Sequence, residues 1–147
     1  MDLQATYSID APASRVWAHL IAPAAVAACL PGCDRLEELG NDTWRAKLNM
    51  TVAAISGSYD GTVAILDKNP PTSYRLRVDG NGRSGFVKGE ASIELLEENG
   101  KTTVTVRGTA EVGGLIARVG QRLLGSVSKM MMDRFFDCMA RSIATLT

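Results

Sequence analysis

The sequence predicts an α+β fold in which a seven-stranded antiparallel sheet packs against one long C-terminal helix. Three observations predict it. Seven segments alternate apolar and polar residues, the links between the last six are short and rich in turn residues, and residues 115–147 carry a helical repeat. The expected order is a strand, two short helices, six strands in a meander and the long helix. Strict alternation implies a sheet with one buried and one solvated face.

The first part of the chain predicts a strand and two short helices. Residues 3–9 alternate as a strand with one buried face does. Pro12 suits the first turn of a helix. The apolar side of this helix is formed by Val16, Trp17 and Leu20. Pro23 begins a second helix that runs to Cys29 and is closed by Pro31-Gly32.

The middle of the chain predicts the meander. The six strands are expected at residues 34–39, 44–50, 55–65, 74–78, 87–95 and 104–112. Four of the links between them are of hairpin length and contain Gly, Asn, Asp or Pro: 40–42, 68–71, 80–83 and 98–100. Short links join neighbouring strands in antiparallel order, so these strands are expected to follow one another across the sheet.

The last segment is expected to form one helix. Its apolar residues recur at steps of three and four, which places them on one face: Ile116, Val119, Leu123, Val127, Met130, Met131, Phe135, Cys138, Ile143 and Leu146. Gly113-Gly114 can end the preceding strand. At ~1.5 Å per residue, about 30 residues span roughly 45 Å, so this helix can lie across the whole sheet.

The composition indicates one globular domain, residues 1–147, with a formal net charge of zero. Basic residues are interspersed with acidic ones and no aromatic stacking platform accompanies them, which excludes a nucleic-acid-binding surface. No apolar run reaches the ~18 residues that a membrane-spanning helix needs, and the first residues do not resemble a signal peptide. We therefore expect a cytoplasmic protein.

The three cysteines, Cys29, Cys33 and Cys138, are expected to be free thiols in a reducing compartment, because their number is odd and small. Cys29 and Cys33 stand four residues apart, but no second pair or matching histidines complete a zinc-binding pattern. No basic cluster adjoins Cys33 in the sequence, which favours a passive thiol over a reactive one. Neither a metal nor another cofactor is expected.

Small residues occupy the strand positions that the alternation assigns to the buried face. They are Gly57, Gly61, Gly89 and Gly108, with Ala91 and Ala110 beside them. Glycine inside a strand leaves nothing to pack, so the inner face is expected to leave an apolar pocket below the helix. The alternative is that the glycines only permit strong coiling while neighbouring side chains fill the space. Leucine at Gly57 or Gly108 is expected to plug the pocket.

Several features together resemble the family of the carbon monoxide dehydrogenase G subunit. They are Pro12 with Val16-Trp17, the turn Leu30-Pro31-Gly32-Cys33, the glycine-bearing strand 56–61 and the long final helix. The resemblance covers essentially the whole chain. It implies the helix-grip fold of the SRPBCC superfamily, with a hydrophobic cavity between a curved seven-stranded sheet and the last helix.

The resemblance also implies a function and a site. Members of the family are accessory proteins of molybdenum-containing carbon monoxide dehydrogenase-type hydroxylases, linked to membrane recruitment of the enzyme or to handling a lipophilic acceptor such as a quinone. A quinone- or lipid-like ligand, hydroxylase subunits and a peripheral membrane contact are thus the expected partners. The ligand-binding residues are expected to be Leu30, Pro31, Leu48, Met50, Ile55, Gly57, Tyr59, Leu76, Phe86, Val104, Leu115, Ile116, Val119 and Leu123. Some relatives carry an apolar tail beyond the final helix; the sequence up to Thr147 gives no support to anchoring by such a tail.

Two other functions remain open from the sequence. One is a cyclase or hydrolase in the same cavity, for which only Tyr59, Tyr74 and the single histidine, His19, offer titratable groups. No nucleophile–histidine motif or phosphate-binding loop accompanies them, so no catalytic mechanism is expected. The other is a docking protein with a filled interior. Arg83 and Arg118 are expected near the cavity mouth, facing either solvent or a polar head group.

Overall fold

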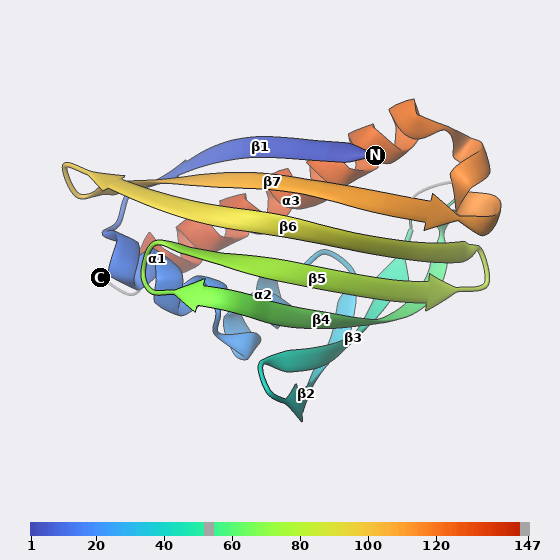
Figure 1. Cartoon of the computed structure of the whole chain (residues 1–147), viewed down its shortest axis with the longest axis horizontal. Coiled ribbons are helices and arrows are strands. Elements are labelled where there is room, and N and C mark those ends of the chain that lie inside the picture. Colours follow the sequence, from blue (N-terminus) through green and yellow to red (C-terminus); the bar gives the residue numbers. More distant parts are fainter. Residues whose placement is uncertain (52–54, 145–147) are drawn as a thin grey trace.

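The computed structural model describes residues 1–51 and 55–144, and it confirms the α+β fold (Figure 1). In these residues the elements run in the following order: β1 (Asp2–Ile9), α1 (Ala13–Leu20), α2 (Pro23–Cys29), β2 (Cys33–Gly40), β3 (Thr43–Met50), β4 (Gly57–Asn69), β5 (Ser73–Gly82), β6 (Gly85–Glu98), β7 (Lys101–Gly113), the 3₁₀ helix η2 (Gly114–Val119) and α3 (Gln121–Ala144).

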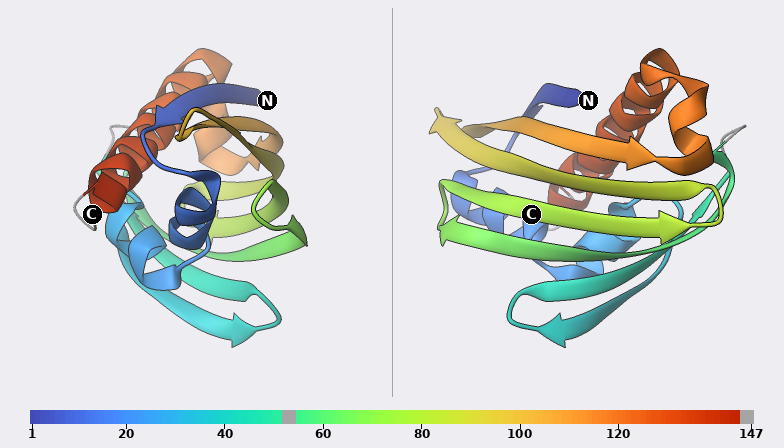
Figure 2. Two further views of the ribbon diagram at one scale, coloured as in Figure 1. Left: turned by 90° about the vertical axis from the view of Figure 1, so that its left-hand side faces the viewer. Right: turned by 45° about the vertical axis from the view of Figure 1, so that its right-hand side comes forward.

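The seven strands described form one sheet in the order β1-β7-β6-β5-β4-β3-β2. All neighbouring strands are antiparallel, so β2 to β7 form the expected meander and β1 adds to the β7 edge. The sheet is strongly curved, and the three α-helices lie on its concave side (Figure 2). Helix α3 runs across that side, with α1 and α2 near its C-terminal end.

Turn chemistry explains where the hairpins fall. Asn41-Asp42 and Asn99-Gly100 all have positive φ, as the two central residues of the tightest hairpin turns require. One expected link is shorter than predicted: β5 continues to Gly82 and β6 starts at Gly85, so only Arg83-Ser84 remain between them. The sequence pattern marks the glycines of 80–83 as turn residues, but Gly80 and Gly82 continue the strand alternation.

The prediction of a single helix over residues 115–147 is wrong at its start. Residues 114–119 form η2, whose backbone is held to the β5–β6 hairpin by a hydrogen bond from Ile116 N to Ser84 O (2.7 Å). Gly120 follows with φ 91° and ψ 154°, a conformation that interrupts any helix, and α3 begins after it. The predicted helical residues 145–147 lie outside the described part of the chain.

The buried stripe of α3 also differs from the prediction. The buried residues of α3 are Val127, Phe136, Met139 and Ile143. Leu123 is exposed, and Phe135 is only half-buried, with its ring edge-on to that of Phe136 at a centroid distance of 5.1 Å. The helix begins at Gln121 and packs against β1, α1 and α2 near its C-terminal end. These two facts determine which face of α3 is buried.

The prediction of three free thiols is also wrong, because Cys29 and Cys138 form a disulfide. These residues are 109 positions apart in the sequence, and the packing of α2 on α3 brings their Cα atoms to 5.4 Å. Cys33 is the free cysteine. Burial and the nearby Asp34 carboxylate raise the pKa of its thiol, whereas its bond to Arg35 O lowers it, and the net shift is upward. A raised pKa favours the passive thiol.

The buried side chains form two separate clusters at opposite ends of the sheet–helix layer. The first cluster joins β1, α1, α2, the strands β5 to β7 and the C-terminal half of α3. It comprises Ile9, Ala11, Val16, Trp17, Leu20, Cys29, Tyr74, Ile93, Leu95, Val104, Val106, Phe136, Met139 and Ile143. The second cluster comprises Ile55, Ile116 and Val127, with partly buried neighbours that include Met50, Tyr59, Val87, Val112 and Val119. The question for function is what lies between the two clusters.

Candidate functional site

A band of small residues crosses the concave face of the sheet between the two clusters. The strand register places its members side by side: Ala46, Gly61, Gly80, Gly89, Ala91, Gly108 and Ala110. Ala46, Gly61 and Gly80 are direct neighbours across β3, β4 and β5, and Gly89 pairs with Ala110 across β6 and β7. We call these seven residues the small-residue band.

Apolar side chains that border this band are less covered than those of the core. Val63 and Val78 share a row of the concave face, remain half-buried and belong to neither cluster. By contrast, Val104 and Ile93, on the same face nearer α1, are 0% and 3% exposed. Since both pairs lie in the same single-layered sheet, the difference reflects how much lies above them on the concave side.

The surroundings of individual glycines distinguish a pocket on the inner face from an inner face that neighbouring side chains fill. A Cβ atom added at Gly80 would find its nearest neighbour, Asp60 O on the adjacent strand, at 3.9 Å. At Gly89 and Gly108 the three nearest atoms also belong to the adjacent strand, and none comes from α3. At Gly80, therefore, no atom of the helix lies within 4 Å of the place where the missing side chain would start.

Other glycines fit the alternative interpretation, in which neighbouring side chains fill the space. At Gly82 the added Cβ would meet the Tyr59 ring at 2.7 Å, and at Gly85 it would meet Ile116 Cγ1 at 2.7 Å. Both glycines lie next to the second cluster. Neighbouring side chains thus fill the space near η2, whereas the place of the missing side chain at Gly80 is open.

Five of the residues expected to bind ligand are brought together by the second cluster. They are Met50, Ile55, Tyr59, Ile116 and Val119. Leu48, opposite Tyr59, and Leu76, opposite Ala91, are half-buried on the concave face. In the strand register, Leu48 and Tyr59 lie next to Ala46 and Gly61, and Leu76 lies beside Ala91 of the small-residue band.

Leu30 and Pro31 lie in the turn after α2, which leads into the edge strand β2. Cys33 N donates to Leu30 O at 3.1 Å and Gly32 has φ 78°, which is a type II turn with Pro at its second and Gly at its third position. A Cβ at Gly32 would collide with Asn49 O, so this turn seats β2 directly against β3. Local turn chemistry therefore explains the motif.

The remaining expected site residues are divided between the first cluster, the outer face of the sheet and the exposed surface. Val104 is fully buried in the first cluster. Phe86 lies on the outer face, where its ring covers Gly113 and the Lys88 ammonium lies 5.9 Å from its centroid. The exposed residues of the set are Gly57, Leu115 and Leu123. The family resemblance places Phe86 at the cavity mouth, whereas the alternation through Val87 and Gly89 puts it on the opposite face.

Two features of the concave face escape the sequence interpretation. Gly80 belongs to the small-residue band, and extending the alternation of Tyr74, Leu76 and Val78 by one step would have found it. Trp44, in the same row as Val63, Val78 and Gly89, is recognisable as a strand residue but not as a site residue.

The titratable groups weighed for catalysis are not assembled into a site. Tyr74 lies in the first cluster, where burial raises the pKa of its phenol far above the ordinary value. Tyr59 lies by the second cluster and donates to Ile55 O at 2.8 Å. The His19 ring, on α1, contacts Arg15 O. Among the described residues, no group of three or more His, Cys, Asp or Glu side chains could hold a metal ion.

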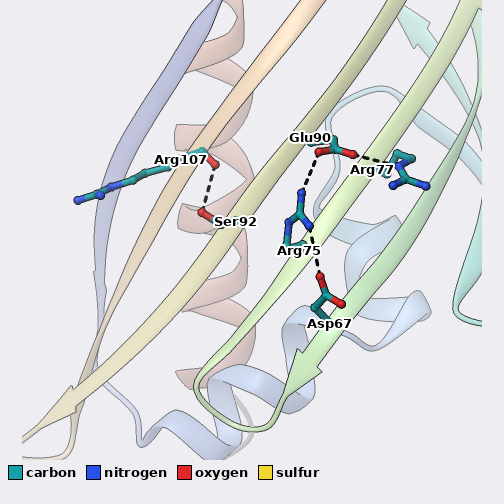
Figure 3. A network of polar contacts seen from close by, with 6 residues as sticks. All are labelled: Asp67, Arg75, Arg77, Glu90, Ser92 and Arg107. Atoms are coloured by element: carbon teal, nitrogen blue, oxygen red, sulfur yellow. Dashed lines mark hydrogen bonds and ion pairs between the residues drawn. The ribbon is translucent and has the colours of Figure 1, made fainter.

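The outer face of the sheet carries charged side chains and two open depressions of about 440 and 380 Å³. Glu90 forms ion pairs with Arg75 (2.9 Å) and Arg77 (3.1 Å), and Arg75 also reaches Asp67 at 3.3 Å (Figure 3). Ser92 Oγ donates to Arg107 O at 3.4 Å nearby. Exposed ion pairs of this kind contribute little stability, and this polar lining does not suit an apolar ligand.

None of the helices in the described part of the chain is long and apolar enough to cross a membrane.

Comparison with known proteins identifies relatives over the whole length. A family model described as that of the carbon monoxide dehydrogenase G subunit (CoxG) matches residues 6–144. A conserved protein from Geobacillus kaustophilus of known crystal structure is 35% identical, with a TM-score of 0.96 over 99% of this chain and 96% of that one. No curated protein sequence matches this chain.

More distant solved structures share the fold. A START superfamily protein from Mycobacterium smegmatis has a TM-score of 0.81 at 13% identity, covering 99% of both chains. A protein from Thermus thermophilus has a TM-score of 0.74 at 14% identity, covering 100% of this chain and 99% of that one.

Proposed function

Because the chain belongs to the CoxG family of the carbon monoxide dehydrogenase G subunit, we propose that it is a non-enzymatic accessory protein that holds a lipophilic small molecule between its sheet and α3. The observation that carries this proposal is the small-residue band. Natural interiors are packed without large voids, so a row of missing side chains between two cores needs a reason. A bound apolar ligand that fills this space would explain the missing side chains.

The proposed ligand is quinone- or lipid-like. The residues around the band are almost all apolar, so affinity comes mainly from burying hydrocarbon, at about 25 cal/mol per Å². The proposed contacts combine expected residues with those added by the structure: Leu48, Met50, Tyr59, Val63, Leu76, Val78, Gly80, Gly89, Gly108 and Val119. Leu30 and Pro31 lie at the rim of this space.

The proposed partner is a molybdenum-containing hydroxylase of the carbon monoxide dehydrogenase type. The family description names a subunit of that enzyme, which supports an accessory role in membrane recruitment or electron-acceptor supply. A peripheral membrane contact belongs to the same proposal. It is supported by Leu115 and Leu123, which are 58% and 36% exposed, and by the exposed Arg118 and Arg122 on the same two elements. Apolar and basic side chains together suit an anionic lipid surface.

A plug variant tests ligand binding. Gly80→Leu adds a side chain on the concave face where the Cβ meets nothing closer than 3.9 Å, so it fills the space without displacing the backbone. We expect it to weaken binding of the fluorescent lipophile 1-anilinonaphthalene-8-sulfonate at least tenfold, measured by titration. The matched control is Asn81→Leu, one residue along the same strand and exposed on the other face, which should bind as the wild type does.

Gly57 and Gly108 are unsuitable for this test, although the sequence suggests them. Gly57 has φ 135°, and a Cβ at Gly108 would lie 2.7 Å from Glu90 O, so leucine at either position strains the backbone. Native mass spectrometry of gently purified protein provides the second readout. If the wild type neither retains a lipophile nor binds the probe, and the hydroxylase is still captured by Gly80→Leu, the docking role without a ligand replaces the proposal.

A further inference from the structure

Trp44 holds a buried hydrogen-bond donor without an acceptor. Trp44 is 9% exposed. Among the described residues, its indole Nε1 is the one buried side-chain nitrogen or oxygen that has no hydrogen-bond partner. Elsewhere the fold satisfies such groups: the fully buried Thr102 hydroxyl donates to Ala11 O at 2.7 Å. Leaving a buried donor unpaired costs free energy, so one on a functional face calls for an explanation.

The position of Trp44 connects this donor to the small-residue band. Trp44 lies on the concave side of β3, two residues from Ala46, and its row continues through Val63 and Val78 to Gly89. It belongs to neither cluster of buried residues, so it is not part of the solid core at either end. Trp44 therefore stands at the β3 end of a row that runs along the small-residue band.

We infer that Trp44 Nε1 donates a hydrogen bond to an acceptor oxygen carried by the bound lipophile, an inference that rests on the proposed function. The ligand class is thereby narrowed to apolar molecules with a carbonyl-type oxygen. An indole N–H can only donate, so a hydroxyl serves through its oxygen and a pure hydrocarbon does not serve at all. Pockets of this kind use a small number of polar groups to fix the orientation of an otherwise apolar ligand.

Two probes of nearly equal shape isolate the hydrogen bond. They are 2-tridecanone and 2-methyl-1-tridecene, in which a terminal alkene carbon replaces the ketone oxygen. Their affinities are measured by displacement of 1-anilinonaphthalene-8-sulfonate from the wild type and from Trp44→Phe, which keeps an aromatic ring and loses the donor. Because the two probes differ in their solubility in water, the informative quantity is the change in their affinity ratio between the two proteins.

We expect Trp44→Phe to weaken binding of the ketone about three- to tenfold, the usual range for one hydrogen bond, and to leave binding of the alkene unchanged. Trp17→Phe is the matched control, since Trp17 packs edge-on to Tyr74 in the first cluster at a centroid distance of 5.3 Å. That variant should leave the affinity ratio of the two probes as in the wild type.

A second measurement is made on the wild-type protein alone. The chain has two tryptophans, so its ¹⁵N-labelled wild-type form gives two indole N–H signals in NMR spectra. The ketone should shift the Trp44 proton downfield and the alkene should not, while Trp17 stays in place. An unshifted Trp44 signal with bound ketone, or an equal loss of both probes in Trp44→Phe, overturns this inference alone. Failure of the wild type to bind either probe overturns the proposed function with it.

Discussion

Tyr7 links the first strand to the last helix through both of its halves. Its ring stacks on Phe136 at a centroid distance of 4.4 Å, and its hydroxyl donates to Asp133 Oδ1 at 2.7 Å. Lys129 Nζ approaches the same carboxylate at 3.1 Å. The Tyr7 hydrogen bond, followed by Lys129, holds the pKa of Asp133 below its usual range. Desolvation, followed by the Asp133 contact, raises the pKa of Tyr7 far above its ordinary value.

The lowered pKa of Asp133 predicts a pH dependence. The folded state favours the ionised form of Asp133. The stability that this carboxylate contributes is therefore fully present above the pKa of the carboxyl group in the unfolded chain. It is lost as the pH falls through the lower pKa of the folded state. We expect Asp133→Asn to be less stable than the wild type at pH 7, with a difference that shrinks towards pH 3. Urea unfolding at several pH values measures it.

Asp137→Asn is the control for this prediction. Asp137 lies one turn further along α3 and pairs with Arg141 at 3.3 Å, with both side chains at least 70% exposed. Removal of that exposed pair should change stability little at any pH. A constant difference between the wild type and Asp133→Asn from pH 7 to pH 3 would contradict the role given to the Tyr7 hydrogen bond.

At the scale of elements, Gly120 determines where α3 begins. Its φ of 91° and ψ of 154° lie in a region that is essentially restricted to glycine, and the chain changes there from η2 to α3. Leu124 N then donates to Gly120 O at 3.1 Å, the first bond of the α-helical pattern. Separating the two elements lets η2 pack on the β5–β6 hairpin while α3 takes its own direction across the sheet.

A pair of glycine variants measures this conformational requirement. A Cβ at Gly120 or at Gly125 would meet nothing within 4 Å, so the two positions differ in backbone conformation and not in space. Gly125→Ala, inside α3, should stabilise the protein by about 0.5–1 kcal/mol. Gly120→Ala should destabilise it by roughly 1–3 kcal/mol, because alanine is strained at that φ. Thermal unfolding of both variants measures these opposite changes in stability. Stabilisation by Gly120→Ala would contradict the role of the Gly120 conformation in separating η2 from α3.

At the scale of the whole molecule, the core is divided. The first cluster ties α1, α2 and the C-terminal half of α3 to the sheet, and the Cys29–Cys138 disulfide joins α2 to α3 in the same region. The second cluster holds η2 and the N-terminal half of α3. Both ends thus keep the sheet and the helix in fixed relation, and the small-residue band lies between them.

The disulfide predicts a large effect of reduction. It joins residues 109 positions apart, and a crosslink over a loop of that length stabilises by about 4–5 kcal/mol in the chain-entropy model. Dithiothreitol should therefore lower the midpoint of urea unfolding markedly in the wild type and in Cys33→Ser, whose free thiol is not involved. Thiol titration of the unreduced, denatured chain should find only Cys33. Three reactive thiols per chain would disprove the pairing.

Most of the fold could be predicted from the sequence because its signals are local. The alternation of the strands, the Asn-Asp and Asn-Gly turns and the prolines at the starts of α1 and α2 act over a few residues, and all seven strands lie close to their expected places. The small-residue band is partly predictable for the same reason. Gly61, Gly89 and Gly108 follow from the period of two, whereas Gly80 lies in a segment whose composition is typical of a turn.

The tertiary structure decided what depends on residues far apart in the chain. Composition could not show that Cys29 meets Cys138, because only the packing of α2 on α3 brings them together. Helical periodicity could not show the break at Gly120, since apolar spacing does not register a positive φ. The space above Gly80 is open, whereas the ring of Tyr59 occupies the space above Gly82. Which of the two applies to a given glycine depends on how the sheet curves beneath the helix, and no local sequence pattern encodes that curvature.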